Sequence, residues 1–177
     1  TFYQIVRKLA QKSNKTDQLS CNILGPASLG FRHRDDIIEI KKILNDMGID
    51  INLIAPMGAS PEDIQIKTAK AHFNVMLYPE VAETACRYLE KEFDQPYTKT
   101  IPIGIGATKE FIKEISDIFG LKMDNHFNER LRADWWSKSI DSTYFTGKRV
   151  YVFGDATHVK SSVKIAHEEM GFEVVGL

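Results

Sequence analysis

Hydrophobic residues follow two alternating spacings along this chain, and the alternation predicts its secondary structure. Where apolar residues recur three or four positions apart, as they do over residues 2–9, an amphipathic helix is expected. The same spacing predicts further helices at 37–47, after Ser60, at 79–93, through 111–119 and at about 157–170. Short apolar runs bounded by turn residues predict strands at 21–24, 49–55, 73–78, about 99–102, 149–153 and 172–175.

Strands that alternate with helices along the whole chain favour an α/β fold. The strands are expected to be parallel, in sheet layers flanked by helices that serve as crossovers. Residues 122–134 show no clear period, and a new strand-loop-helix unit begins at Gly147. We therefore expect most of one domain, with an amino-terminal connecting helix, in residues 1–145. The start of the next domain is expected in residues 146–177.

Two local signals support the helix assignments. Ser60 precedes Pro61 and stands three residues before Asp63, which approximates a capping box at a helix start. The charged run at 32–36 places two aspartates where acids complement the dipole of the following helix. The arginines of the same run could instead bind a carboxylate of a substrate or a partner subunit.

Composition narrows the class of protein. Of the 177 residues, 43% are apolar and 27% are charged, which is typical of a globular chain with a core. The net charge of −1 (23 − 24) gives no reason to expect broad electrostatic binding to nucleic acid. No apolar run approaches the roughly 20 residues of a membrane-spanning helix. The first residue is Thr1, and the chain stops directly after a strand-like run. We therefore expect both ends to be cut.

Residues that could hold a metal or a phosphate give weak signals. Cys21 and Cys86 lie outside any metal-ligand spacing, so we expect both to be buried, reduced thiols. Reduced thiols in turn favour a reducing cytoplasm. The glycines of 104–106 lack the third glycine of a dinucleotide fingerprint and are expected to form a strand-to-helix turn. The segment 154–158 is similar, although Asp155 would repel an anion there.

The strongest chemical signal is an acid among large aromatic side chains. Asp141 lies in the run WWSKSIDSTY at 135–144, with Trp135 and Trp136 close by. Desolvation favours the neutral carboxyl, so such an acid could donate a proton to a flat conjugated substrate near neutral pH. On composition alone, an acid at the edge of a core and a pair of structural indoles remain the alternatives.

Several longer motifs point to one family. In chain order they are LGPASLGFRHRDD (24–36), APMGASP (55–61), LYPE (77–80), PIGIGAT (102–108), WWSKSIDSTY (135–144) and GKRVYVFGDATH (147–158). Together they resemble the B subunit of light-independent (dark-operative) protochlorophyllide reductase, a nitrogenase-like family. The resemblance extends over nearly the whole chain, and it implies a nitrogenase-component-like architecture of three Rossmann-like domains around a cleft. This chain would then be a central part of the longer protein.

The resemblance implies an activity and a role for each candidate residue. The family reduces the ring D double bond of protochlorophyllide to give chlorophyllide, with Asp141 as the expected proton donor. Trp135 and Trp136 are expected to bind the substrate. Lys138 departs from the smaller residue expected there, which leaves the acid intact but could alter the charge around it.

The resemblance also implies cofactors and partners. The B subunit would pair with an N subunit in an N2B2 heterotetramer that holds a [4Fe-4S] cluster. Its ligands would come from the N subunit and from an amino-terminal region absent here, so no cofactor or metal ligand is expected in this chain. A dimeric iron-sulfur protein, the L protein, would use ATP to deliver electrons. The expected location is the cytoplasm of a phototrophic bacterium, or the chloroplast stroma if plastid-encoded.

Two other functions remain open. A paralogous reductase of the chlorophyllide reductase type would share the architecture and the electron path but not these motifs. A non-catalytic α/β binding module would use the same cleft without redox chemistry.

Overall fold

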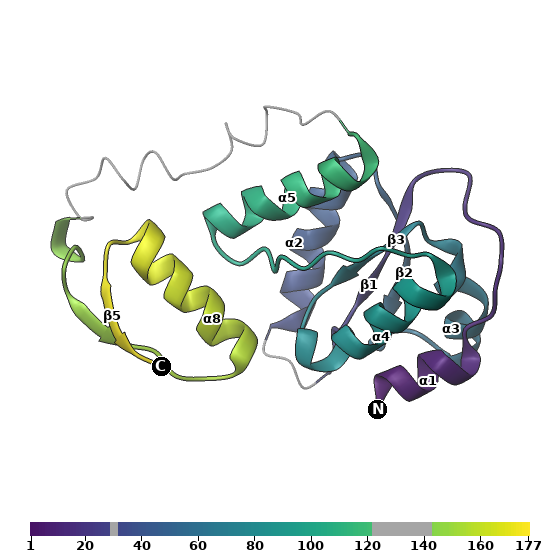
Figure 1. Cartoon of the computed structure of the whole chain (residues 1–177), viewed down its shortest axis with the longest axis horizontal. Helices are drawn as coiled ribbons and strands as arrows, with labels where there is room; N and C mark the ends of the chain where they lie inside the picture. The colour runs from purple at the N-terminus through teal and green to yellow at the C-terminus, as the bar shows by residue number, and fades with distance from the viewer. Residues whose placement is uncertain (29–31, 122–142) are drawn as a thin grey trace. The chain divides into compact units, whose positions relative to one another are not determined.

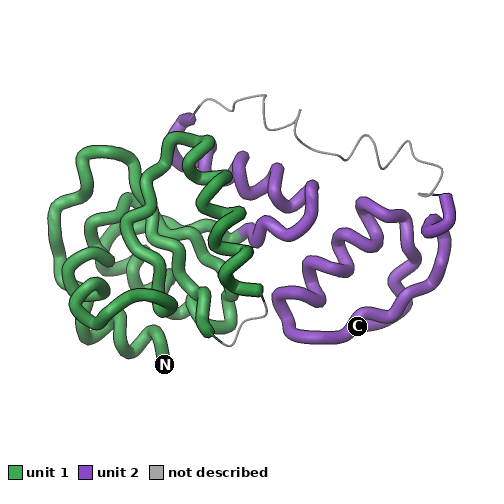
Figure 2. Tube along the Cα trace, turned by 180° about the vertical axis from the view of Figure 1, so that it is seen from behind, with its two compact units in different colours: residues 1–99 green, residues 100–177 purple. Residues whose placement is uncertain are grey.

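The computed structural model describes residues 1–28, 32–121 and 143–177 of the chain. These residues form two compact units, residues 1–99 and residues 100–177 (Figure 2). The division separates two groups of residues that each pack among themselves. The domain boundary expected between residues 145 and 146 stays a prediction.

The first unit is built on a parallel sheet of three strands, labelled in Figure 1. The strands are β1 (Ser20–Leu24), β2 (Asp50–Ala55) and β3 (Phe73–Met76), in the spatial order β2-β1-β3. Tyr97 adds one isolated parallel bridge to Asn74 at the outer side of β3. The central strand β1 is buried at all five of its residues, because it is flanked by a strand on each side and has no face toward solvent.

Helices cover this sheet and complete its core. They are α1 (Phe2–Leu9), α2 (His33–Asp46), α3 (Pro61–Lys67), which runs into the 3-10 turn η1 (Thr68–Lys70), and α4 (Pro79–Phe93). One cluster joins α1, α3 and α4 to the strands through Phe2, Val6, Leu24, Leu53, Ile64, Met76, Ala85 and Leu89. Tyr3 of α1 meets Tyr88 of α4 edge to face, with ring centroids 5.8 Å apart. Apolar burial therefore fixes α1 against α4.

A row of asparagines crosses the sheet inside the first unit. The Asn22 side chain of β1 donates to Asn74 Oδ1 of β3 and to the Thr68 carbonyl, each at 2.9 Å. Asn52 of β2 donates to Asn22 Oδ1 at 2.7 Å. The Gln95 amide also donates to the Thr68 carbonyl, at 3.0 Å. Because a buried amide costs free energy unless it is paired, this row favours one alignment of the three strands.

The second unit combines one long helix with a two-stranded parallel sheet. Its elements are α5 (Ile105–Phe119), β4 (Arg149–Tyr151), α8 (Ala156–Lys164), the π-helical turn η3 (Ile165–Glu169) and β5 (Glu173–Gly176). β4 pairs with β5 over Arg149–Glu173 and Val150–Val174. Phe145 and Phe172 pack edge to face beside this pair, with centroids 5.3 Å apart.

The expected α/β alternation with parallel strands is confirmed, and α4 has the expected bounds. One expected strand was wrong. The strand expected at about 99–102 is absent, because the pairing at the edge of β3 is confined to Tyr97 in the described residues. The helix expected at about 157–170 is present, as α8 followed directly by the π turn η3.

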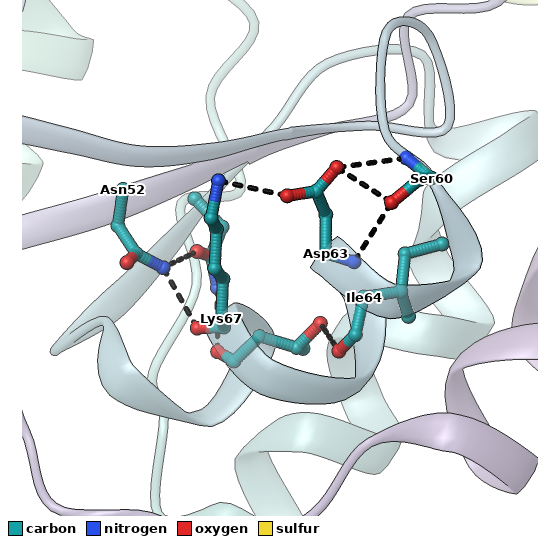
Figure 3. Close-up of polar contacts among 7 residues, drawn as sticks. Asn52, Ser60, Asp63, Ile64 and Lys67 are labelled. Atoms are coloured by element: carbon teal, nitrogen blue, oxygen red, sulfur yellow. Dashed lines mark hydrogen bonds and ion pairs between the residues drawn. The ribbon is translucent and has the colours of Figure 1, made fainter.

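The capping box expected at the start of α3 is present, as Figure 3 shows. Ser60 Oγ accepts from the Asp63 backbone N–H at 3.0 Å, and Asp63 accepts from the Ser60 backbone N–H at 3.0 Å. Lys67 Nζ lies 2.8 Å from Asp63 Oδ1. The Asn52 side-chain amide donates to the Lys67 carbonyl. The hydrogen bonds from Lys67 and then Ser60 lower the pKa of Asp63. The cap therefore stabilises α3 at neutral pH and weakens in acid, below about pH 4.

We expect Ser60→Ala to lower the free energy of unfolding by about 1 kcal/mol, because one N-terminal N–H of α3 loses its acceptor. Thermal unfolding should then have a midpoint lower by about 2–4 °C for a chain of this size. Ser13→Ala, at an exposed serine outside any helix, is the matched control. An equal shift in both variants would contradict the capping role.

Candidate functional site

The three residues expected to carry the chemistry, Asp141, Trp135 and Trp136, lie outside the described residues. Their assignment stays a prediction. The structure describes both flanks of their segment. On one side α5 ends at Phe119, with Gly120 as its cap in the left-handed region, and on the other the description resumes at Thr143 before β4.

Within the first unit, the loops that follow the three strands converge at one edge of the sheet. Parallel strands place their carboxyl ends together, and in open α/β sheets the crevice outside those ends is where ligands bind. Gly25 donates to the Ala55 carbonyl at 2.9 Å, and Leu77 donates to the Leu24 carbonyl at 2.8 Å. In the order β2-β1-β3, the connection from β1 leads to one side of the sheet and the next connection leads to the other side. The topological switch point therefore lies between β1 and β3. We therefore take the loops after these two strands as the candidate ligand-facing edge.

Gly25 makes the close approach of these loops possible. Its φ is 118°, and a Cβ on it would lie 1.5 Å from the Leu77 carbonyl oxygen. Only glycine fits between the two backbones, both for its conformation and for its lack of a side chain. The glycine of the motif at 24–36 therefore has a packing reason that the sequence pattern alone did not give.

Tyr78 joins the loop after β3 to the start of α2. It takes a left-handed conformation (φ 57°, ψ 74°) directly before Pro79, the first residue of α4. Its phenol donates a short hydrogen bond to the carboxylate of Asp36, and the tyrosine is 9% exposed. The sequence assigned Asp36 to the helix dipole alone and gave Tyr78 no role, because a contact across 42 residues leaves no local pattern.

The cysteines of the described residues do not suit a metal or cluster. Cys21 and Cys86 are both free and fully buried, as expected. Burial raises the pKa of the Cys21 thiol, and burial together with Glu83 and Glu90 raises the pKa of Cys86 to about 12. Across 1–28, 32–121 and 143–177, no three His, Cys, Asp or Glu side chains are grouped for a metal ion.

Both glycine-containing turns that resembled anion sites are occupied by carboxylates of the chain itself. At the start of α5, the Gly106 N–H donates to Glu169 Oε1 at 2.8 Å. At the start of α8, Asp155 Oδ1 accepts from the His158 N–H at 3.1 Å, which is the main cause of the lowered Asp155 pKa. These turns are therefore helix starts with internal caps. The turn expected at 104–106 does lead into a helix, α5, but no strand directly precedes it.

No helix among the described residues is long and apolar enough to cross a membrane.

The whole chain, residues 1–177, matches the family model of the nitrogenase component 1 type oxidoreductases. It is 61% identical to the B subunit of light-independent protochlorophyllide reductase from Dinoroseobacter shibae, over 100% of this chain and 33% of that protein. Identity is 58% with the corresponding protein of Cereibacter sphaeroides and 50% with that of Prochlorococcus marinus, covering 34% and 36% of those proteins. The chain thus spans about a third of the length of these relatives.

A solved structure titled nitrogenase Cp1 at pH 6.5 has a similar fold. The TM-score is 0.73 over 97% of this chain and 41% of that chain, at 22% sequence identity. A likeness at this identity concerns the fold, and it agrees with the expected nitrogenase-component-like architecture.

We expect Cys21 and Cys86 to react very slowly with a thiol reagent at pH 8 in the native protein, because their raised pKa values leave almost no thiolate. Both should react rapidly after denaturation, and the difference is measured by timed alkylation and mass spectrometry. Rapid labelling of the native protein at either position would contradict the burial assigned to it. Stability should fall as pH rises past about 8.5, since only the unfolded thiols then ionise.

Proposed function

Because the chain belongs to the nitrogenase component 1 type oxidoreductase family, we propose that it works within the catalytic component of a light-independent protochlorophyllide reductase. The reaction is the reduction of the ring D double bond of protochlorophyllide to chlorophyllide, in (bacterio)chlorophyll biosynthesis. One observation carries this proposal, the 61% identity along all 177 residues to a protein named as the B subunit of that enzyme.

Asp141 is proposed as the proton donor in this reaction. Saturating a carbon-carbon double bond adds two electrons and two protons, and a carbanion-like centre formed on the ring must take its proton from a positioned acid. A carboxyl beside Trp135, Trp136 and Ile140 would be partly desolvated, which favours the protonated form that can donate. The indoles would also offer flat apolar surface to the tetrapyrrole.

Partners and cofactors follow from the same family. We propose an N2B2 heterotetramer with an N subunit, and electron delivery by a separate ATP-hydrolysing L protein dimer. A [4Fe-4S] cluster would supply electrons when bound. Since Cys21 and Cys86 do not suit cluster ligation, its ligands would come from the N subunit and from an amino-terminal part of the full-length B protein. The proposed location is the cytoplasm of a phototrophic bacterium, or the stroma if plastid-encoded.

Two other functions are separable by experiment. A chlorophyllide-reductase-type paralogue would consume chlorophyllide in place of protochlorophyllide when the reconstituted complex is offered each tetrapyrrole. A non-catalytic binding module would form neither product in the assembled complex. The level of identity to proteins named for protochlorophyllide favours reduction of protochlorophyllide over both alternatives.

We expect Asp141→Asn in the full-length protein to lower turnover by about 10²- to 10⁴-fold, since the amide keeps the shape of the acid but cannot supply a comparable proton. Assembly and cluster content should be unchanged, and a one-electron-reduced substrate should accumulate because electrons still arrive. Chlorophyllide formation per assembled complex is the measurement. Near-normal turnover would refute Asp141 as the donor while leaving the family standing.

We expect Trp135→Ala and Trp136→Ala, tested separately, to differ in effect, since adjacent residues in extended backbone face opposite sides. The indole that borders the substrate should, when removed, weaken protochlorophyllide binding more than it lowers the melting temperature. Fluorescence quenching on substrate addition measures the binding. Lost stability with unchanged affinity in both variants would assign both indoles to packing.

A further inference from the structure

One hydrogen bond in the first unit crosses the carboxyl edge of the sheet, from one helical layer to the other. α4 shares a core cluster with α1 and α3 on one face of the sheet, whereas α2 lies on the opposite face (Figure 1). The Tyr78 phenol, at the start of α4, donates to the half-buried Asp36 carboxylate in the first turn of α2. Because α2 follows β1 and α4 follows β3, the bond joins the two strand ends between which the switch point lies.

Tyr78 holds a backbone conformation that its place in the sequence disfavours. Its φ of 57° and ψ of 74° lie in the left-handed region, which a residue other than glycine adopts at a cost. The next residue is Pro79, and a residue before proline favours extended backbone. Local preference therefore works against the observed turn at 77–79, and the bond to Asp36 helps to offset it. Backbone strain of this kind is concentrated at binding and catalytic sites.

The bond connects two helices and does not serve as a cap for either. Among the described residues, the N-caps of α2 and α4 are Arg32 and Tyr78, and both lack a side-chain capping bond. The bond instead fixes the separation between the start of α2 and the loop after β3. The same loop is also held to β1, where the Leu77 N–H donates to the Leu24 carbonyl at 2.8 Å. Tyr78 therefore fixes the geometry of the candidate ligand-facing edge.

We propose that Tyr78 is a positioning residue for the binding of protochlorophyllide, acting through Asp36 to hold the loop after β3 and the start of α2 in the arrangement that accepts the ligand. The inference rests on the proposed function, since it takes protochlorophyllide as the ligand of this edge. The apparent Kd of a ligand rises as the fraction of molecules in the binding-competent arrangement falls. Loss of the bond lets the turn at 77–79 relax and lowers that fraction, while the chemical step is untouched.

The test measures protochlorophyllide binding, by fluorescence titration, and turnover in the assembled full-length complex. We expect Tyr78→Phe to raise Kd and KM by about 3- to 30-fold with kcat nearly unchanged, because a hydrogen bond to a charged group is lost and the competent arrangement is less populated. Asp36→Ala should have the same effect. Asp36→Asn should keep most of the affinity, since its amide oxygen still accepts from the phenol.

The double variant tests whether the two residues act through one bond. Tyr78→Phe combined with Asp36→Ala should weaken binding no further than either change alone, because both remove the same interaction. Effects on Kd that multiply in the double variant would indicate two independent contacts and would overturn the proposal.

Two matched controls separate positioning from stability. Tyr97 is 8% exposed, close to the 9% of Tyr78, and its phenol is hydrogen-bonded to Arg87. It bridges to Asn74 within β3 and not to the loop that follows the strand. Tyr97→Phe should therefore lower the melting temperature by a similar amount and leave KM unchanged. Asp35→Ala removes an acid from the same turn of α2 without touching the bond, and it should also leave KM unchanged.

Other outcomes would also overturn the proposal. An unchanged Kd in Tyr78→Phe, or an equal rise of KM in Tyr97→Phe, would do so. A fall in kcat at constant KM would place Tyr78 in the chemistry instead, and failure of both Tyr78→Phe and Asp36→Asn complexes to assemble would make the bond purely structural. The proposed function fails in a different experiment, by a wild-type complex that neither binds nor reduces protochlorophyllide. The two failures can therefore be told apart.

Discussion

The pairing of the Asn22 side chain inside the sheet is the constraint on which the first unit depends. β1 has no solvent-facing side, so every polar group on it needs a partner within the protein. Asn22 meets this need by bonding Asn52 on one neighbouring strand and Asn74 on the other. A shift of either neighbouring strand by one residue would turn these amides to the opposite face and leave them unpaired in the core. The row thereby selects the observed register.

The register in turn determines which loops meet at the carboxyl edge of the sheet. With Leu24 opposite both Ala55 and Met76, the turns after the three strands begin at the same level. Gly25 can then approach the Leu77 carbonyl, and Tyr78 can reach Asp36 across the edge. The left-handed backbone of Tyr78 costs free energy, which the hydrogen bond from its phenol to Asp36 helps to offset.

In the second unit, carboxylates provide the specific polar contacts that paired amides provide in the first unit. Its helices begin at glycine-containing turns, and carboxylates of the chain satisfy the exposed N–H groups at both. Asp155 caps its own helix, whereas α5 depends on Glu169 from a distant segment. A helix capped from elsewhere is coupled to the element that caps it, so the packing of α5 depends on η3.

The sequence by itself determined the features that short segments encode. The helix Pro79–Phe93 was delimited correctly because a proline start and helical spacing are local signals, and Ser60 with Asp63 indicated the cap of α3 within four residues. The family resemblance was likewise carried by contiguous motifs, each read from neighbouring residues. Only the tertiary structure decided the partners of Asn22, Tyr78 and Glu169, which lie tens of residues away. It also limited the strand expected near 99–102 to a bridge at Tyr97, since strand pairing depends on a neighbour that local pattern does not specify.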